Sequence, residues 1–149
     1  MAESVRREVT VPWGPEDAFG RFAGDTGSWW PREFTWSQEV LVAIGIEAGE
    51  NGMCFELGPH GFRCDWGRVL LWDPPRRLVL TWQIGPDRVP VPDATRASEV
   101  HVTFEPAGDD RTRVVVEHRA FERHGPAGDA YAAGMGQGWD HLLARYAGG

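Results

Sequence analysis

His118 is the side chain best suited to chemistry. It shares one side of a strand-like segment with Val114 and Val116, so we expect its imidazole to point inward. A neutral imidazole on an apolar wall can orient a ligand oxygen or act as an acid or base near neutral pH. Such a histidine is more often simply a hydrogen-bonded core residue. The sequence leaves both roles open.

Arg68 is the second candidate, because it shares its strand parity with Trp66 and Trp72. An arginine beside tryptophans can stack on an indole, and one that faces a pocket can bind a ligand carboxylate through two hydrogen bonds. The alternative is a solvated arginine that covers an aromatic face.

The composition excludes several kinds of site. All 15 basic residues are arginine, and the absence of lysine excludes Schiff-base chemistry, a pyridoxal phosphate anchor and a P-loop. The net charge is −7, and the arginines stand singly or in pairs, which disfavours binding of nucleic acid.

Metal and nucleophile motifs are also missing. Cys54 and Cys64 form no Cys-x-x-Cys pair, and His118 with His124 lacks the spacing of a metal site. The chain has no Gly-x-Ser-x-Gly sequence around a nucleophilic serine. We therefore expect no metal, no cofactor and two reduced thiols.

The 149 residues suggest one domain, residues 1–149. No apolar run of about 18 residues suits a membrane span, and the first residues lack the apolar stretch of a signal peptide. The expectation is a cytoplasmic protein that does not associate with membranes.

Strand-like alternation dominates the chain that must position these side chains. It predicts a strand over 5–11 and, after Pro12, two short helices, the first beginning at Pro15 and the second at Asp25. Further strands are predicted from Phe34 to Ile46 and over 53–57, 62–72, 77–84, 98–104 and 112–121. Together they indicate an antiparallel meander.

Two connections between these strands bear on function. A Gly58–Gly61 turn would place Leu57 opposite Phe62 and Phe55 opposite Cys64, whereas a turn one residue shorter would place the two cysteines opposite each other. The proline-containing loop over 85–97 is long enough to be a lid or an interaction loop.

The chain ends in a predicted amphipathic helix. Its apolar face carries Tyr131, Met135, Trp139, Leu142, Leu143 and Tyr146. Gly138 lies within that face, although glycine costs about 1 kcal/mol relative to alanine inside a helix. Close packing of the backbone on the sheet is the favoured reason, and space left beneath the helix is the alternative.

Eight tryptophans compensate for a low content of aliphatic residues. Trp13, Trp29 and Trp30 are expected to anchor the short helices, and Trp72 to support the end of its strand. The remaining four are expected to converge between sheet and terminal helix: Trp36, Trp66, Trp82 and Trp139.

At this point the sequence resembles a known family. It is similar to the START-related SRPBCC superfamily, in the bacterial branch that resembles the activator of heat-shock-protein (Hsp90) ATPase homologue. The residues that carry the likeness include Val11-Pro12, 15–19, Trp29-Trp30-Pro31, 66–69, 72–82, 112–118 and Gly138-Trp139. The resemblance implies an α+β helix-grip fold, in which a curved antiparallel sheet of about seven strands wraps around a long C-terminal helix.

The same resemblance implies a pocket between sheet and helix that accepts a hydrophobic small molecule. The residues expected to line it are Trp36, Phe55, Trp66, Arg68, Trp82, His118, Met135 and Trp139. Two alternatives stay open: a cyclase or hydratase that uses His118, and a protein-interaction module similar to the chaperone activator. Relatives with this fold also pair, so a homodimer is possible.

Overall fold

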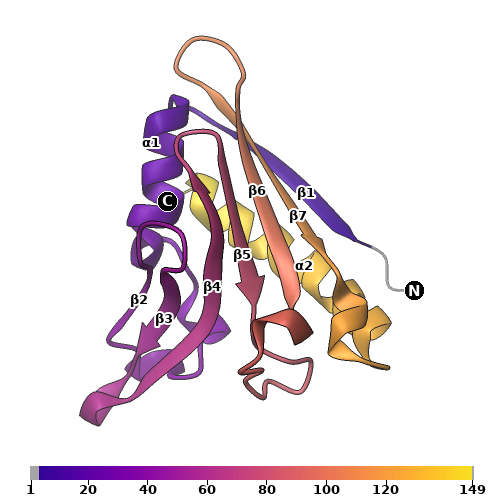
Figure 1. Ribbon diagram of the computed structural model, residues 1–149. Coiled ribbons are helices and arrows are strands. Elements are labelled where there is room, and N and C mark those ends of the chain that lie inside the picture. The colour runs from indigo at the N-terminus through magenta and orange to yellow at the C-terminus, as the bar shows by residue number, and fades with distance from the viewer. Residues whose placement is uncertain (1–3, 149) are drawn as a thin grey trace.

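The computed structural model describes residues 4–148. Its centre is a seven-stranded antiparallel sheet in the order β1-β7-β6-β5-β4-β3-β2 (Figure 1). The strands are β1 (Val5–Val11), β2 (Ala43–Ile46), β3 (Met53–Leu57), β4 (Arg63–Asp73), β5 (Arg77–Trp82), β6 (Ser98–Pro106) and β7 (Thr112–Arg119). The predicted meander is thereby confirmed.

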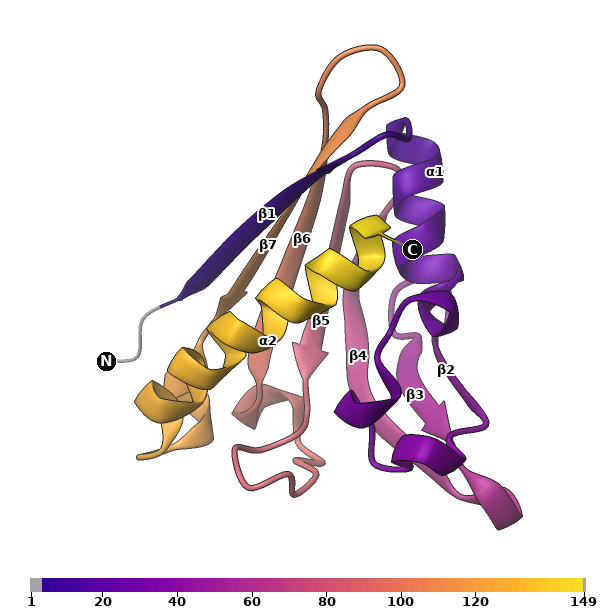
Figure 2. The same ribbon diagram turned by 180° about the vertical axis from the view of Figure 1, so that it is seen from behind.

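The long helix α2 (Gly128–Gly148) crosses the concave face of the curved sheet (Figure 2). Its apolar face is buried through Trp139, Leu142, Leu143 and Tyr146. Buried and less buried residues alternate along β6, because strand side chains alternate between the two faces, and β7 meets the helix where Trp139 is hydrogen-bonded to His118. This arrangement confirms the α+β helix-grip fold.

Short helices follow the first strand, as the sequence predicts. Helix α1 (Pro15–Phe19) begins with a proline and two acidic residues, both favourable at a helix N-terminus, and continues into a π-helical turn over Gly20–Gly24. Its buried face carries Ala18, Phe19 and Phe22. A 3-10 turn follows over Thr26–Ser28.

The predicted strand from Phe34 to Ile46 is wrong over most of its length. Only β2 is extended, and two 3-10 turns, Arg32–Phe34 and Gln38–Val40, precede it. The carboxylate of Glu56 accepts hydrogen bonds from the backbone N–H groups of Trp36 and Ser37, which a strand would have used in its ladder. We call residues 32–40 the rim segment.

The β3–β4 hairpin has neither of the two predicted registers. Leu57 pairs with Arg63 and Glu56 with Cys64, so the connecting turn is one residue longer than expected. Both cysteines are free. With this register Glu56 is buried, while Phe55 is only half-buried.

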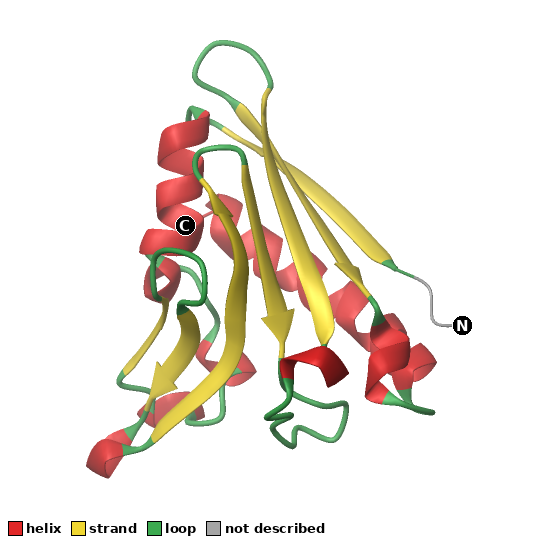
Figure 3. Cartoon of the chain, in the orientation of Figure 1, coloured by secondary structure: helices red, strands yellow, loops and turns green. Residues whose placement is uncertain are grey.

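The β5–β6 connection and the rim segment lie at the same end of the sheet (Figure 3). A hydrogen bond from Arg88 to the carbonyl oxygen of Thr35 joins them. Among residues 4–148, no helix has the length and apolar character needed to cross a membrane.

Candidate functional site

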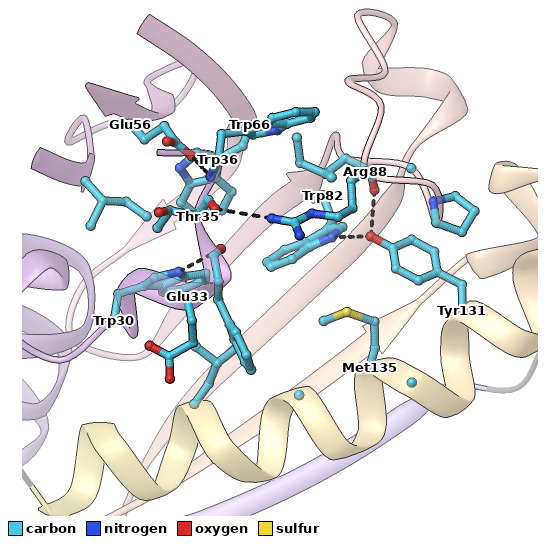
Figure 4. A pocket seen from close by; sticks show the side chains of 18 residues that line it. Trp30, Glu33, Thr35, Trp36, Glu56, Trp66, Trp82, Arg88, Tyr131 and Met135 are labelled. Carbon is cyan, nitrogen blue, oxygen red and sulfur yellow. Dashed lines mark hydrogen bonds between the residues drawn. The ribbon is translucent and has the colours of Figure 1, made fainter. Parts of the chain in front are cut away.

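A cavity of about 370 Å³ lies between the sheet and α2, at the end of the sheet where the rim segment and the β5–β6 connection meet (Figure 4). Its wall combines six aromatic side chains with a few polar ones. The lining residues are Trp30, Glu33, Phe34, Thr35, Trp36, Ile44, Glu56, Trp66, Trp82, Ile84, Gly85, Pro86, Arg88, Tyr131, Gly134, Met135, Gly138 and Leu142.

Glycines on α2 leave the helical side of this cavity open. A methyl group placed at Gly134 would meet no atom within 4 Å, and one at Gly138 would meet only the Cε atom of Met135 at 3.8 Å. The favoured expectation of close packing at Gly138 is therefore wrong. Close packing occurs at Gly136, where a methyl group would lie 2.7 Å from Nη2 of Arg7.

Three indoles form one wall of the cavity, with Trp66 and Trp82 on strands β4 and β5 and Trp30 in the loop before the rim segment. The ring centroids of Trp30 and Trp66 are 5.3 Å apart, and those of Trp30 and Trp82 are 6.1 Å apart with an interplanar angle of 29°. The Nε1–H of Trp82 donates to the Tyr131 hydroxyl at 2.7 Å, and that hydroxyl donates to the carbonyl of Ile84 at 2.6 Å. These bonds hold the wall in place across the cavity.

The rim segment carries exposed aromatic rings. Phe34 is 42% exposed and Trp36 is 40% exposed, although both line the cavity. The carboxylate of Glu56, buried on β3, fixes this segment from one side through its two backbone hydrogen bonds of 2.8 and 2.9 Å. From the other side, Arg88 donates to the Thr35 carbonyl at 3.3 Å.

Four of the residues expected at the pocket line this cavity: Trp36, Trp66, Trp82 and Met135. Trp139 lies outside the lining. It is 1% exposed, and its ring centroid lies 5.9 Å from that of Trp82. Trp139 therefore supports the wall from the protein interior.

His118 also lies outside the cavity lining, fully buried beside Trp139. The indole Nε1–H of Trp139 donates to Nδ1 of His118 at 3.1 Å, so the proton of the neutral imidazole is on Nε2. This N–H donates to the Ser98 hydroxyl at 2.8 Å, which in turn donates to Nε2 of His124 at 2.8 Å. His118 is a core residue with both ring nitrogens engaged.

Burial lowers the pKa of His118 to about 3, and the nearby His124 adds to the effect. The imidazole is therefore neutral at neutral pH and has no direct path to a bound molecule. The hypothesis of acid or base catalysis by His118 lacks the contact it requires.

Phe55 and Arg68 lie away from the cavity. The ring of Phe55 packs over Gly45, and the guanidinium of Arg63 lies 5.0 Å from its centroid. Arg68 is exposed. The longer hairpin turn explains why Phe55 lies away from the cavity, because it places Cys54 and Glu56 on the buried side of the strand.

Sequence reasoning missed several lining residues. Tyr131 belongs to the predicted apolar face of the helix, and Arg88 to the loop predicted to be a lid or an interaction loop, so the sequence pointed to both regions. Trp30 was expected to anchor a short helix. Nothing in the sequence indicated that Glu56 lines the cavity, because the burial of Glu56 depends on the hairpin register. Within residues 4–148, no three His, Cys, Asp or Glu side chains gather to form a possible metal site.

Comparisons with known proteins agree with this architecture. The family model of the activator of Hsp90 ATPase homolog 1-like protein matches residues 25–147. No curated protein matches the chain.

Solved structures with similar folds include the anthrahydroquino-gamma-pyrone synthase Txn09 complexed with SUM. It is 32% identical, the match covers 97% of this chain and 95% of that one, and the TM-score is 0.67. The self-sacrificing resistance protein CalC from Micromonospora echinospora is 28% identical, with 96% and 90% covered and a TM-score of 0.65.

Protein MLL2253 from Mesorhizobium loti is 18% identical over 97% of this chain and 93% of that one. Its TM-score is 0.64, and this likeness concerns the fold alone. Since the family model covers most of the sequence and the helix-grip fold is present, the chain belongs to the activator of Hsp90 ATPase homolog 1-like family, within the SRPBCC superfamily.

Proposed function

We propose that this protein binds a flat hydrophobic small molecule in the cavity beneath α2. The observation that carries the proposal is the space at Gly134 and Gly138, which faces the indoles of Trp30, Trp66 and Trp82. A volume of about 370 Å³ lies within the range of small-molecule pockets, roughly 300–1,000 Å³. Aromatic walls favour planar guests, because offset stacking adds to the burial of apolar area.

The two relatives with the higher identities support a small-molecule role. One is a synthase of a polycyclic aromatic product by its name, and the other is a resistance protein. Catalysis on the bound molecule is the second candidate, favoured by the 32% identity with the synthase. Burial raises the pKa of Tyr131 to about 12, so its hydroxyl would act as a neutral hydrogen-bonding group.

Binding is tested by titration with N-phenyl-1-naphthylamine, a neutral planar probe, while its fluorescence and that of tryptophan are followed. We expect saturable binding to the wild type. The Gly138→Leu variant places a side chain in the cavity and should weaken binding by about tenfold or more, equivalent to about 1.4 kcal/mol.

The matched control is Gly20→Leu, because Gly20 is exposed and a methyl group there meets no atom within 4 Å. Circular dichroism and urea unfolding establish that both variants fold. Equal affinity of folded Gly138→Leu and wild type would overturn the proposal. Catalysis is tested separately, by mass spectrometry of a polyketide-type aromatic probe after incubation, and an unchanged probe counts against it.

A further inference from the structure

The wall of the cavity has a hydrogen-bond donor without an acceptor. Trp66 is 5% exposed, and its Nε1–H is covered and has no partner among residues 4–148. Because protein atoms cover this donor, a molecule in the cavity does not reach it. The neighbouring Trp82 shows the contrast, since its Nε1–H is bonded to Tyr131.

Arg88 supplies further free donors. It is the one basic residue in the cavity lining, and within residues 4–148 it forms no ion pair with a carboxylate. Its hydrogen bond to the Thr35 carbonyl is long, at 3.3 Å, and its guanidinium lies 6.0 Å from the ring centroid of Trp36. A guanidinium has five N–H donors, so most of this capacity is unused.

The backbone holds Arg88 in this position at a cost. Its φ of 67° lies in the left-handed region, which is unfavourable for a residue other than glycine. The Arg88 N–H donates to the Gly85 carbonyl at 2.9 Å, and the Gly85 N–H donates to the Val89 carbonyl at 2.8 Å. This turn directs the guanidinium across the cavity toward the rim segment, as Figure 4 shows.

Most side-chain acceptors of the wall are already engaged, and the exposed carboxylate of Glu33 is the exception. Both carboxylate oxygens of Glu56 accept backbone N–H groups, and the Tyr131 hydroxyl accepts from Trp82. The carboxylate of Glu33 lies 3.5 Å from Nε2 of His141 on α2. The unused capacity therefore consists mainly of donors, and one of them carries a positive charge.

We propose that the ligand is a planar aromatic molecule with an anionic oxygen group, such as a carboxylate, sulfonate or phenolate, and that Arg88 binds this group. The inference rests on the proposed function, because it concerns the same cavity. On binding, the guanidinium exchanges the Thr35 carbonyl for the charged oxygens, to which it can donate two hydrogen bonds.

Two probes with the same skeleton test this proposal. N-phenyl-1-naphthylamine is neutral, and 1-anilinonaphthalene-8-sulfonate adds one sulfonate. We expect the wild type to bind the sulfonate about tenfold more tightly, and Arg88→Gln to remove this preference by weakening binding of the sulfonate much more than binding of the neutral probe. Arg88→Lys keeps the charge without the planar fork and should retain part of the preference.

Arg96→Gln is the matched control, because Arg96 is exposed in the same connection but outside the cavity lining. It should leave both affinities unchanged. The role of Arg88 is overturned if Arg88→Gln keeps the preference for the sulfonate or weakens binding of both probes equally. The proposed function still stands in that case, provided that the neutral probe binds in the cavity. If Gly138→Leu affects neither probe, the proposed function itself fails.

Discussion

The space beneath α2 has two halves that differ in how they are filled. In the closed half, Ser98, His118, Phe121 and Trp139 are each at most 1% exposed, and the ring centroids of His118 and Phe121 are 4.2 Å apart. In the open half, the same helix borders the cavity. One amphipathic helix thus completes a core at one place and leaves a binding site at another.

The polar groups of the two halves differ in the same way. In the closed half, the hydrogen bonds run in one direction from Trp139 through His118 and Ser98 to Nε2 of His124, and within residues 4–148 only the buried Nδ1 of His124 in this chain of bonds lacks a partner. In the open half, Arg88 keeps unused donors in the cavity lining. An unpaired group therefore indicates a place for a ligand only where, as at Arg88, it also lines the cavity.

The largest expected difference between the halves is in stability. Trp139→Ala should lower the free energy of unfolding by about 3–5 kcal/mol, because it removes a fully buried indole and the donor to His118. Trp36→Ala, at the exposed rim, should cost about 1 kcal/mol or less. Urea unfolding measures both, and similar losses would contradict the distinction.

The closed half should also make stability depend on pH. The pKa of His118 is about 3 in the folded protein and near 6.5 in the unfolded chain. Below about pH 6.5 the unfolded chain gains a proton that folded His118 does not, so stability falls by about 1.4 kcal/mol per pH unit. Burial also lowers the pKa values of His124 and His101, which act in the same direction.

This dependence is measured by urea unfolding between about pH 7.5 and about pH 5.5, above the usual range of carboxyl titration. His118→Asn keeps an acceptor for the Trp139 indole and cannot titrate, so its pH slope should be smaller than that of the wild type. An unchanged slope in this variant would mean that His118 is not the source.

A smaller effect separates two glycines of the same helix. Gly138→Ala should raise the free energy of unfolding by about 0.5–1 kcal/mol, because alanine favours the helix and its methyl group enters open space. Gly136→Ala should gain less, because its methyl group must displace the guanidinium of Arg7, which forms an ion pair with Asp140 at 2.8 Å. A larger gain at Gly136 would contradict the assignment of the two faces.

Much of the fold was predictable because it depends on local patterns. Alternation located six strands, and helical periodicity located α2 with Tyr131 and Met135 on one face. The rim segment was not predictable, because its turns depend on the carboxylate of Glu56, about twenty residues along the chain.

The same limit applies to the cavity. Strand parity correctly placed Trp66 and Trp82 at the cavity. Phe55 was misplaced because the hairpin register differs from the predicted one. His118 was expected to be able to contact a ligand, and its burial prevents that contact. Trp30 and Arg88 reach the cavity only through the path of two loops. Parity establishes which way a side chain points, but hairpin length and loop path decide what it meets.

The central claim is that one half of the space beneath α2 holds a guest. The tryptophans divide between that half and the rest of the molecule. Those that line the cavity are Trp30, Trp36, Trp66 and Trp82. Those outside its lining are Trp13, Trp29, Trp72 and Trp139.

The most direct measurement is fluorine NMR of the protein labelled with 5-fluorotryptophan, with each of the eight resonances assigned by a single Trp→Phe variant. Addition of N-phenyl-1-naphthylamine should shift the resonances of the four tryptophans that line the cavity more than those of the other four. Shifts no larger at the lining residues than at Trp13 or Trp72, or no saturable shift at all, would contradict the account.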